Sequence, residues 1–252
     1  VARLPGLAAV SNMASRFAEN SSRGLAESEL STLPISVTEV ASVSFQASCV
    51  GNSCAVTTRD GNVICDTGLI IQASEQVTKL KALIGDAEPK KIILSHSHAD
   101  HVGGTRLWDR GQAELIAHEE FEEEQRYLTE LNPYRHQRNR VLFPWIPESP
   151  RTLVGMNFRG LIPDTRGRDG APYRFSLGGR RFEVHAMPGA EGAGNVVLWL
   201  PDEKIRLSGD FFGPQFPQCP HLFTLRGAKG RNPIEHTAAL HPLPARAPAG
   251  TP

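Results

Sequence analysis

The sequence predicts an α+β fold in one large domain, and three features of the 252-residue chain lead to this expectation. Alternating, β-branched stretches come first, strands and helices alternate in the middle, and strands return later. Hydrophobic residues make up 40% and charged residues 21% of the chain, which excludes fibrous, collagen-like and wholly disordered proteins. The length suits one large domain, although two smaller domains would also fit.

The first third of the chain is predicted to contain a peripheral arm, several antiparallel strands and one helix. Residues 1–34 mix polar residues and alanines with weak helical periodicity, which indicates the arm. Strands are expected at residues 35–46, 54–58 and 62–66. A helix is expected at residues 72–84, which carry apolar side chains at helical spacing and end at Gly85.

The rest of the chain is predicted to alternate strands and helices before a second group of strands. Further strands are expected at residues 91–94, 113–117, 173–177, 181–186, 196–200 and 205–208. Helices are expected at 108–110 and 119–131. The second helix should stop near Pro133, and the Pro-, Arg- and Gly-rich residues 144–170 indicate a long irregular connection. We therefore expect a domain at 35–231 and a Pro- and Ala-rich tail at 232–252 with little order.

Charge and hydrophobic patterning exclude two classes of partner, and cysteine content bears on the cellular compartment. Lys and Arg together number 27, as do Asp and Glu, so no strong overall field favours nucleic acid or an anionic membrane as a partner. No apolar run approaches the roughly 18 to 20 residues that span a bilayer.

The sequence has four cysteines, Cys49, Cys54, Cys65 and Cys219. They form no C-x-x-C pair, so we expect neither a disulfide scaffold nor a cysteine zinc site. A cytoplasmic protein is expected, and a periplasmic or secreted one stays open if a signal has been removed.

The densest chemical signal is a run of three histidines and one aspartate that follows the strand expected at 91–94. The four residues are His96, His98, Asp100 and His101. In an extended segment His96 and His98 project to one face, and a turn after them can bring the other two to an adjacent point. Imidazole nitrogens and carboxylate oxygens are zinc ligands, and the two glycines that follow allow a tight turn. The alternative is a surface cluster or a set of core histidines with hydrogen-bond partners.

This run resembles the H-x-H-x-D-H signature of the metallo-β-lactamase superfamily. The resemblance implies a four-layer αββα sandwich with a dinuclear metal site at one edge, and makes residues 35–231 a catalytic domain. Asp66-Thr67-Gly68 is similar to the Asp-x-Gly turn that supports the site in that family. The sequence contains none of the motifs that mark serine hydrolases (G-x-S-x-G), P-loop nucleotide hydrolases or dinucleotide-binding proteins (G-x-G-x-x-G).

Further site residues follow from the resemblance. Where the family has a Pro-Gly-His-Thr turn, this chain has no His, but Glu191 offers a carboxylate. The alkylsulfatase branch has a similar stretch with two Glu residues. The first corresponds to Glu191, and Asn195 stands in place of the second. Asp210 follows a strand and is expected to bridge two metals, with a turn carboxylate as the alternative. Residues 223–228 resemble the Tyr-Thr-Leu-Arg-Gly-Ala stretch of alkylsulfatases, which makes Arg226 an anion clamp. The alternative for Arg226 is a surface turn.

Other conspicuous residues are predicted to have structural roles. The acidic run 119–124 is expected to be a solvated helix face, and the basic run 135–140 a surface or ion-pairing segment. His118 and His185 are expected in the core or in support of the site. Tyr127 and other aromatics could line a substrate channel, with core packing as the default.

The histidine that usually ends the ligand set of the superfamily has no clear counterpart. We expect neither His236 nor His241 to be a ligand, and keep His241 as a weak substitute. The second metal is then held loosely, completed by a partner chain in a homo-oligomer, or affected by an altered C-terminus.

The predicted function is a zinc-dependent hydrolase in which a metal-bound hydroxide cleaves an ester-type bond of a small, anionic substrate, with a sulfate ester as the first candidate. The first zinc is assigned His96, His98 and Glu191. The second is assigned Asp100 and His101, with Asp210 as the bridge. Asp100 also orients the hydroxide, and Arg226 neutralises substrate charge. β-Lactamase, lactonase or thioesterase activity, a non-catalytic metal-binding module, and oxygenase chemistry with iron are the alternatives.

Overall fold

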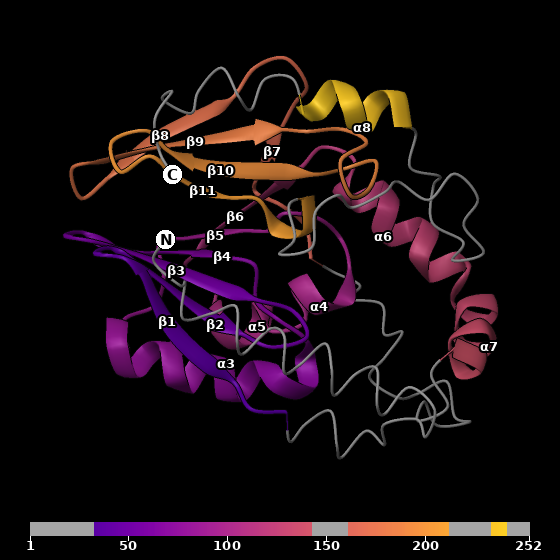
Figure 1. Cartoon of the computed structure of the whole chain (residues 1–252), viewed down its shortest axis with the longest axis horizontal. Helices are drawn as coiled ribbons and strands as arrows, with labels where there is room; N and C mark the ends of the chain where they lie inside the picture. The colour runs from indigo at the N-terminus through magenta and orange to yellow at the C-terminus, as the bar shows by residue number, and fades with distance from the viewer. Residues whose placement is uncertain (1–32, 143–160, 212–232, 241–252) are drawn as a thin grey trace, which may run out of the picture.

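Two stacked β-sheets with helices on both outer faces form the described part of the protein (Figure 1). The computed structural model describes residues 33–142, 161–211 and 233–240. This arrangement confirms the predicted α+β, four-layer αββα architecture. The predicted arm at 1–34 lies almost wholly outside the described residues.

The first sheet has seven strands in chain order: β1 (Ser36–Ala41), β2 (Ser44–Ser48), β3 (Ser53–Thr58), β4 (Gly61–Cys65), β5 (Lys91–Ile93), β6 (Glu114–His118) and β7 (Thr165–Gly167). Its first four strands are antiparallel neighbours, and β4 to β7 run parallel. The second sheet is antiparallel, in the order β11 (Ile205–Leu207), β10 (Val196–Leu200), β9 (Arg180–Ala186) and β8 (Tyr173–Leu177). Parallel strands end at the same edge, so the loops that follow β4 and β5 lie together.

The helices divide between the two outer faces. The first sheet is accompanied by α3 (Ile70–Ile84), α4 (Ala99–Val102) and α5 (Thr105–Trp108). Two more helices follow β6, namely α6 (Phe121–Glu130) and α7 (Asn132–Leu142). The second sheet is covered by α8 (Pro233–Leu240), which Figure 1 shows beyond β9.

Alternation along the strands explains how one sequence fills three apolar layers. Ile92 packs toward the helices that cover the first sheet, whereas Ile93 points between the two sheets. Val196 likewise faces the space between the sheets, while Val197 packs with Ala239 of α8. Successive side chains of a strand point to opposite faces, so near-continuous apolar runs are what a sheet covered on both sides requires.

The structure corrects three expectations about element boundaries. The strand expected at 35–46 is a hairpin, because a turn at Ser42 and Val43 separates β1 from β2. Pro133 lies in the first turn of α7, where its missing N–H costs no helical hydrogen bond, so a second helix follows the first. In the tail, residues 233–240 form α8 instead of lacking order.

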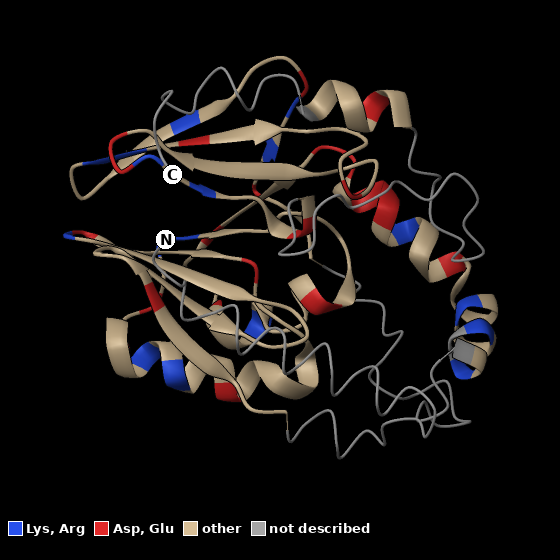
Figure 2. Cartoon of the chain, viewed as in Figure 1, with Lys and Arg blue, Asp and Glu red and all other residues tan. Residues whose placement is uncertain are grey.

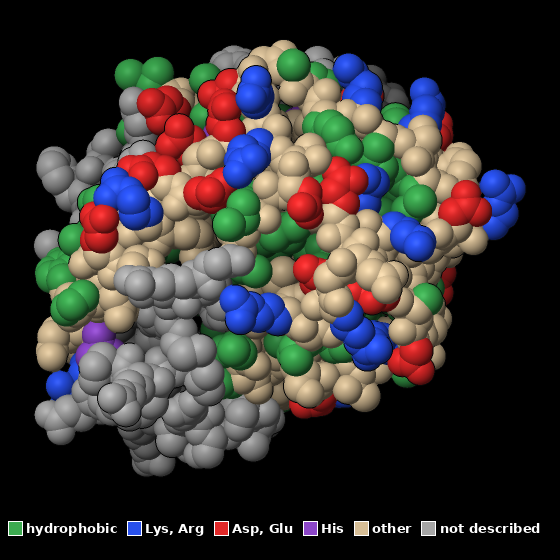
Figure 3. Space-filling view, turned by 180° about the vertical axis from the view of Figure 1, so that it is seen from behind, with side chains coloured by type: hydrophobic (Ala, Val, Ile, Leu, Met, Phe, Trp, Pro, Cys, Tyr) green, Lys and Arg blue, Asp and Glu red, His purple; other side chains and the backbone are tan. Residues whose placement is uncertain are grey.

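Charged residues of both signs are spread over the described surface. Figure 2 shows an acidic α6 next to a basic α7, and Figure 3 shows acidic and basic side chains interspersed on the face opposite that of Figure 1. This distribution agrees with the equal totals of acidic and basic residues. Within the described ranges, every helix is too short or too polar to span a membrane.

Candidate metal centre

Loops from both sheets bring the candidate ligands to one edge of the sandwich. The chain leaves β5 through Ser95 and enters the loop with His96 and His98, and His101 lies in α4 directly after it. Glu191 lies in the connection between β9 and β10, and Asp210 lies in a short 3-10 helix after β11. The first three candidates therefore depend on the first sheet, and the last two on the second.

The first group of donors consists of His96, His98 and Glu191. Each residue offers one ligand atom, and these atoms all lie within 4.8 Å of one another. His96 Nε2 lies 2.9 Å from His98 Nδ1, and His98 Nδ1 lies 3.8 Å from Glu191 Oε1. His96 and Glu191 are buried, whereas His98 is partly exposed. This is the set that the sequence assigns to the first zinc.

The second group consists of His96, His101 and Asp210, again with ligand atoms within 4.8 Å. His101 Nε2 lies 3.2 Å from Asp210 Oδ1 and 3.6 Å from Asp100 Oδ2. This buried nitrogen makes no hydrogen bond of acceptable geometry with the described residues. An orphaned imidazole nitrogen beside carboxylates is the donor chemistry that zinc accepts, so the residues present fit a metal ion.

His96 is common to both groups but can serve only one ion. Its Nδ1 lies 2.9 Å from Ser95 Oγ, which leaves Nε2 as the ligand atom. If His96 belongs to the first ion, the second keeps His101 and Asp210. Asp100 lies close to His101 but is a member of neither group, so its role as a ligand stays a prediction.

Asp66 supports the second group from the end of β4. Its carboxylate accepts hydrogen bonds from the backbone N–H of Ser95 at 2.7 Å and from Ser95 Oγ at 2.7 Å. The other ring nitrogen of His101, Nδ1, lies 2.8 Å from Asp66 Oδ2. A His that donates Nδ1–H to a carboxylate presents Nε2 outward in a fixed orientation. Asp66 itself has a φ of 57°, a strained conformation for a non-glycine residue. The supporting turn suggested by the family resemblance is therefore present.

Carboxylates around His101 change the acid–base properties of the centre. Burial alone lowers the pKa of His101, but Asp66, Asp100 and Asp210 together raise this pKa well above its usual value. Burial also raises the pKa of Asp100, and the nearby imidazole of His101 opposes that shift. A proton and a metal cation therefore compete for this imidazole.

Close packing, rather than unusual dihedral angles, explains the two glycines after the histidine run. Gly103 and Gly104 have φ values of −61° and −95°, which any residue adopts. A Cβ on Gly103 would lie 2.4 Å from the backbone N of Ile70, and one on Gly104 would lie 2.3 Å from Thr67 O. The glycines thus let the histidine loop approach the segment after β4, which differs from the expected role in a tight turn.

Histidines outside the two groups have other partners. His118 Nε2 lies 3.1 Å from Asp169, and His185 Nε2 lies 2.8 Å from Glu183, in agreement with structural roles. His236 is buried, and its Nδ1 lies 2.8 Å from the carbonyl oxygen of Ala190, so it supports the turn that carries Glu191. Arg226, His241 and Cys219 lie outside the described residues. The other three cysteines are free thiols, as expected.

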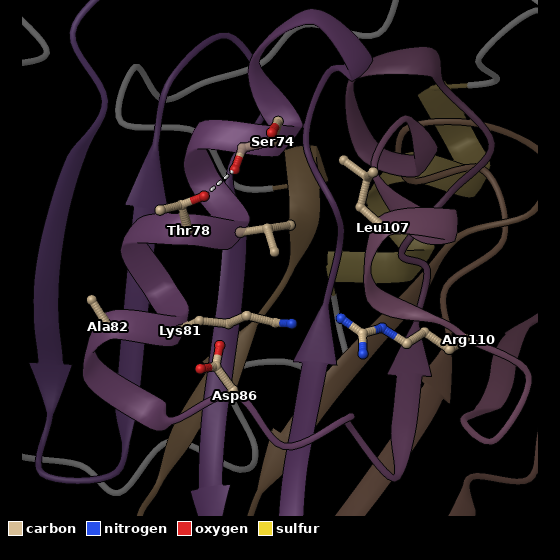
Figure 4. A pocket seen from close by; sticks show the side chains of 8 residues that line it. Ser74, Thr78, Lys81, Ala82, Asp86, Leu107 and Arg110 are labelled. Carbon is tan, nitrogen blue, oxygen red and sulfur yellow. Dashed lines mark hydrogen bonds between the residues drawn. The ribbon is translucent and has the colours of Figure 1, made fainter.

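Two cavities differ in their relation to the donors. A cavity of about 450 Å³ lies between α3 and α5, and Figure 4 shows Lys81 and Arg110 pointing toward one another across it. None of the metal-ligand candidates lines it. A cavity of about 20 Å³, with room for about one water molecule, borders the first donor group. Its lining residues are Ser97, His98, Glu124, Tyr127, Leu128, Glu191 and Gly192.

The fold agrees with comparisons to known proteins. A family model described as "Metallo-beta-lactamase superfamily" matches residues 48–246, so the chain belongs to the metallo-beta-lactamase superfamily. A linear primary-alkylsulfatase from Pseudomonas sp. (strain ATCC 19151) is 25% identical over 210 residues, which are 73% of this chain and 37% of that protein. A protein named as a probable metallo-hydrolase, YybB of Bacillus subtilis (strain 168), is 34% identical over 157 residues, which are 61% of this chain and 59% of that protein. The chain thus spans about 37% and 59% of the length of these curated relatives.

Solved structures show the same fold at low sequence identity. A metallo-beta-lactamase from Pontibacter korlensis superposes with a TM-score of 0.57 and 20% identity, covering 86% of this chain and 87% of that one. The inverting sec-alkylsulfatase Pisa1 from Pseudomonas sp. gives a TM-score of 0.63 and 18% identity, covering 86% of this chain and 38% of that one. At these identities the likeness establishes the fold.

Proposed function

We propose that this protein is a zinc-dependent hydrolase that cleaves an ester-type bond of a small anionic substrate, with a sulfate ester as the first candidate. The observation that carries the proposal is the pair of donor groups that share His96. In each group the ligand atoms lie within 4.8 Å of one another. The names of two relatives, an alkylsulfatase and a probable metallo-hydrolase, support the reaction type. When bound, zinc lowers the pKa of a coordinated water toward about 7 and polarises a substrate oxygen.

The residues of the chain would prepare this chemistry by position and charge. His96, His98 and Glu191 would hold one ion, and His101 with Asp210 would hold the other. Asp66 keeps His101 Nε2 directed at the site through its hydrogen bond to Nδ1. Asp100, whose Oδ2 lies 3.6 Å from His101 Nε2, would orient the attacking water or complete the ligands of the second ion.

Arg226 would recognise the charge of the substrate. The proposal comes from the similarity of residues 223–228 to the alkylsulfatase stretch, since Arg226 lies outside the described residues. We expect Arg226→Ala to lower kcat/KM for a sulfate ester by about 10- to 100-fold, because a charge-assisted hydrogen bond contributes about 1.5–3 kcal/mol. Arg226→Lys should recover part of this loss, and hydrolysis of a neutral lactone should not change. Equal losses on both substrates would contradict the role of anion clamp.

A specific observation also favours a second candidate, a non-catalytic module with one metal ion. His96 Nδ1 lies 2.9 Å from Ser95 Oγ, so only His96 Nε2 faces the other donors. The described residues thus offer three donors to one ion and only two, with Asp100 nearby, to the other. Such a module would bind one ion tightly and hydrolyse nothing.

Metal content and turnover of the same sample separate the two candidates. Zinc-loaded protein should contain about two ions per chain and should hydrolyse at least one of five substrates, namely sulfate, phosphate, lactone, thioester and β-lactam compounds. Chelation should abolish this turnover, and zinc should restore it. His98→Ala should lose activity, while His185→Gln, at a histidine that belongs to neither donor group and whose Nε2 lies 2.8 Å from Glu183, should keep it. One tightly bound ion without turnover on any substrate would support the module instead. Bound iron with oxygen consumption would indicate the oxygenase alternative.

A further inference from the structure

The acidic run at the start of α6 does not form a single solvated face. Glu122 and Glu123 reach solvent and pair with Arg166 and Arg126. Glu124 instead contacts the loops of the metal centre. The prediction of a solvated run is therefore wrong at Glu124, because its carboxylate points back toward the protein.

The carboxylate of Glu124 joins two loops that are distant in the sequence. Ser97 Oγ donates a hydrogen bond to Glu124 Oε2 at 2.8 Å, and the backbone N–H of Gly194 donates one to Oε1 at 3.0 Å. The next residue of the helix contributes as well, because Gln125 Nε2 donates to the carbonyl oxygen of Ser97 at 2.9 Å. One turn of α6 thus holds both loops at once.

These two loops carry all three donors of the first group. Ser97 lies between His96 and His98 on the loop from the first sheet, and Gly194 follows Glu191 on the loop from the second. No strand pairing joins the two sheets within the described residues. The separation of 3.8 Å between His98 Nδ1 and Glu191 Oε1 therefore depends on contacts between the loops.

Glu124 packs closely against the loop that carries Glu191. A Cβ added to Gly192 would lie 3.0 Å from Glu124 Oε1, closer than most real contacts of a Cβ. Glu124, His98 and Glu191 also line the same cavity of about 20 Å³. The carboxylate is consequently close to the first donor group without being one of its members.

We infer that Glu124 is a positioning residue that holds the Glu191 loop against the His96–His98 loop and so sets the affinity of the first metal position. The inference rests on the proposed function, since it concerns the same donors. Residues that hold metal ligands in place typically change metal affinity by about 10- to 100-fold when they are removed.

Two substitutions of Glu124 separate tethering from a general effect on folding. Glu124→Ala removes both hydrogen bonds that the carboxylate makes to the loops, and leaves the direct backbone hydrogen bond from Val196 N–H to Ser95 O. Glu124→Gln keeps both side-chain bonds to the loops, because the amide oxygen can accept from Gly194 and the amide nitrogen can donate to the hydroxyl of Ser97. Glu123→Ala, one residue earlier on the same helix, is the matched control.

The experiment measures zinc affinity of the full chain by competition with a chromophoric chelator, and checks folding by circular dichroism. We expect Glu124→Ala to weaken the binding of one zinc ion about 10- to 100-fold, with Glu124→Gln and Glu123→Ala close to wild type. If Glu124→Ala does not fold, Ser97→Ala replaces it, and a weakening of several-fold is expected since one of the two bonds is lost. Wild-type affinity in the alanine variant, or equal losses in the alanine and glutamine variants, would overturn the inference.

The same data distinguish this inference from the proposed function. A wild-type chain that binds no zinc tightly removes the proposed function, and the inference with it. A wild-type chain that binds zinc and hydrolyses its substrate, with Glu124→Ala unchanged in zinc affinity, removes only the role of Glu124.

Discussion

The two donor groups meet at His96, yet the protein holds them in different ways. His101 is held by the first sheet, because the buried carboxylate of Asp66 at the end of β4 accepts a hydrogen bond from the N–H of Ser95, in the loop after β5, and lies 2.8 Å from His101 Nδ1. The Glu191 side reaches across from the other sheet and is tied to its neighbours through α6. His101 and the carboxylate that holds its ring follow strands of the same sheet, whereas His98 and Glu191 follow strands of different sheets and depend on contacts between their loops. The first arrangement should matter more for stability, and the second more for metal binding.

Removal of Asp66 should have the largest effect on the free energy of unfolding of the metal-free protein. Asp66→Ala leaves the N–H of Ser95 and the imidazole of His101 without their buried acceptor, so we expect a loss of about 3–5 kcal/mol. Urea denaturation measures this value. Asp169→Ala is a matched control, because it removes the carboxylate partner of another buried histidine, His118, but from a side chain that is 57% exposed. Similar losses for the two variants would contradict the importance of the buried network.

A smaller loss is expected for a change at the glycine before Asp210. Gly209 has a φ of 56°, and a Cβ there would lie 2.3 Å from Ser95 Oγ. Gly209→Ala should therefore cost about 1–3 kcal/mol and should also weaken metal binding, because it pushes the Asp210 turn away from Ser95. Gly179→Ala provides the comparison, since its φ of 84° is strained while nothing lies within 4 Å of its Cβ. If both variants keep full zinc affinity, the close packing at Gly209 does not position Asp210.

The smallest change in stability is expected on the Glu191 side. Glu191→Gln should alter the free energy of unfolding of the metal-free protein by about 1 kcal/mol or less, because Glu191 is not part of the network around Asp66. Zinc binding should respond strongly instead, with one of two ions lost at limiting zinc, since a neutral amide is a weaker ligand than a carboxylate. Mass spectrometry under native conditions would count the ions. Full occupancy in this variant would argue that Glu191 is not a ligand.

Local signals in the sequence were sufficient for most of the fold. The strand at Tyr173–Leu177 is observed with the predicted bounds, because alternation along a strand and flanking turn residues are local properties. The hairpin at Ser42 and Val43 was missed since this turn carries none of the Gly, Pro, Asn or Asp residues that usually mark one. The helix after Pro133 was missed because a proline that ends one helix can equally begin the next.

The candidate site was predictable where chemistry is concentrated in a short stretch, and not where it depends on distant contacts. His96, His98 and His101 are recognisable from spacing alone, and the structure brings Glu191 and Asp210 to them. That His96 lies within reach of both groups could not be inferred from spacing, because it depends on how the two sheets stack. Glu124 was hidden within an acidic run, and only a tertiary contact distinguishes it from its neighbours.

The placement of donors on both sheets has a consequence for how the molecule unfolds. His101 follows the first sheet and Asp210 follows the second, with their ligand atoms 3.2 Å apart. A cation bound by both residues would link two sheets that are far apart along the chain, and would stabilise the folded state by mass action. The melting temperature should then rise with free zinc concentration, and the rise should vanish when either His101 or Asp210 is replaced.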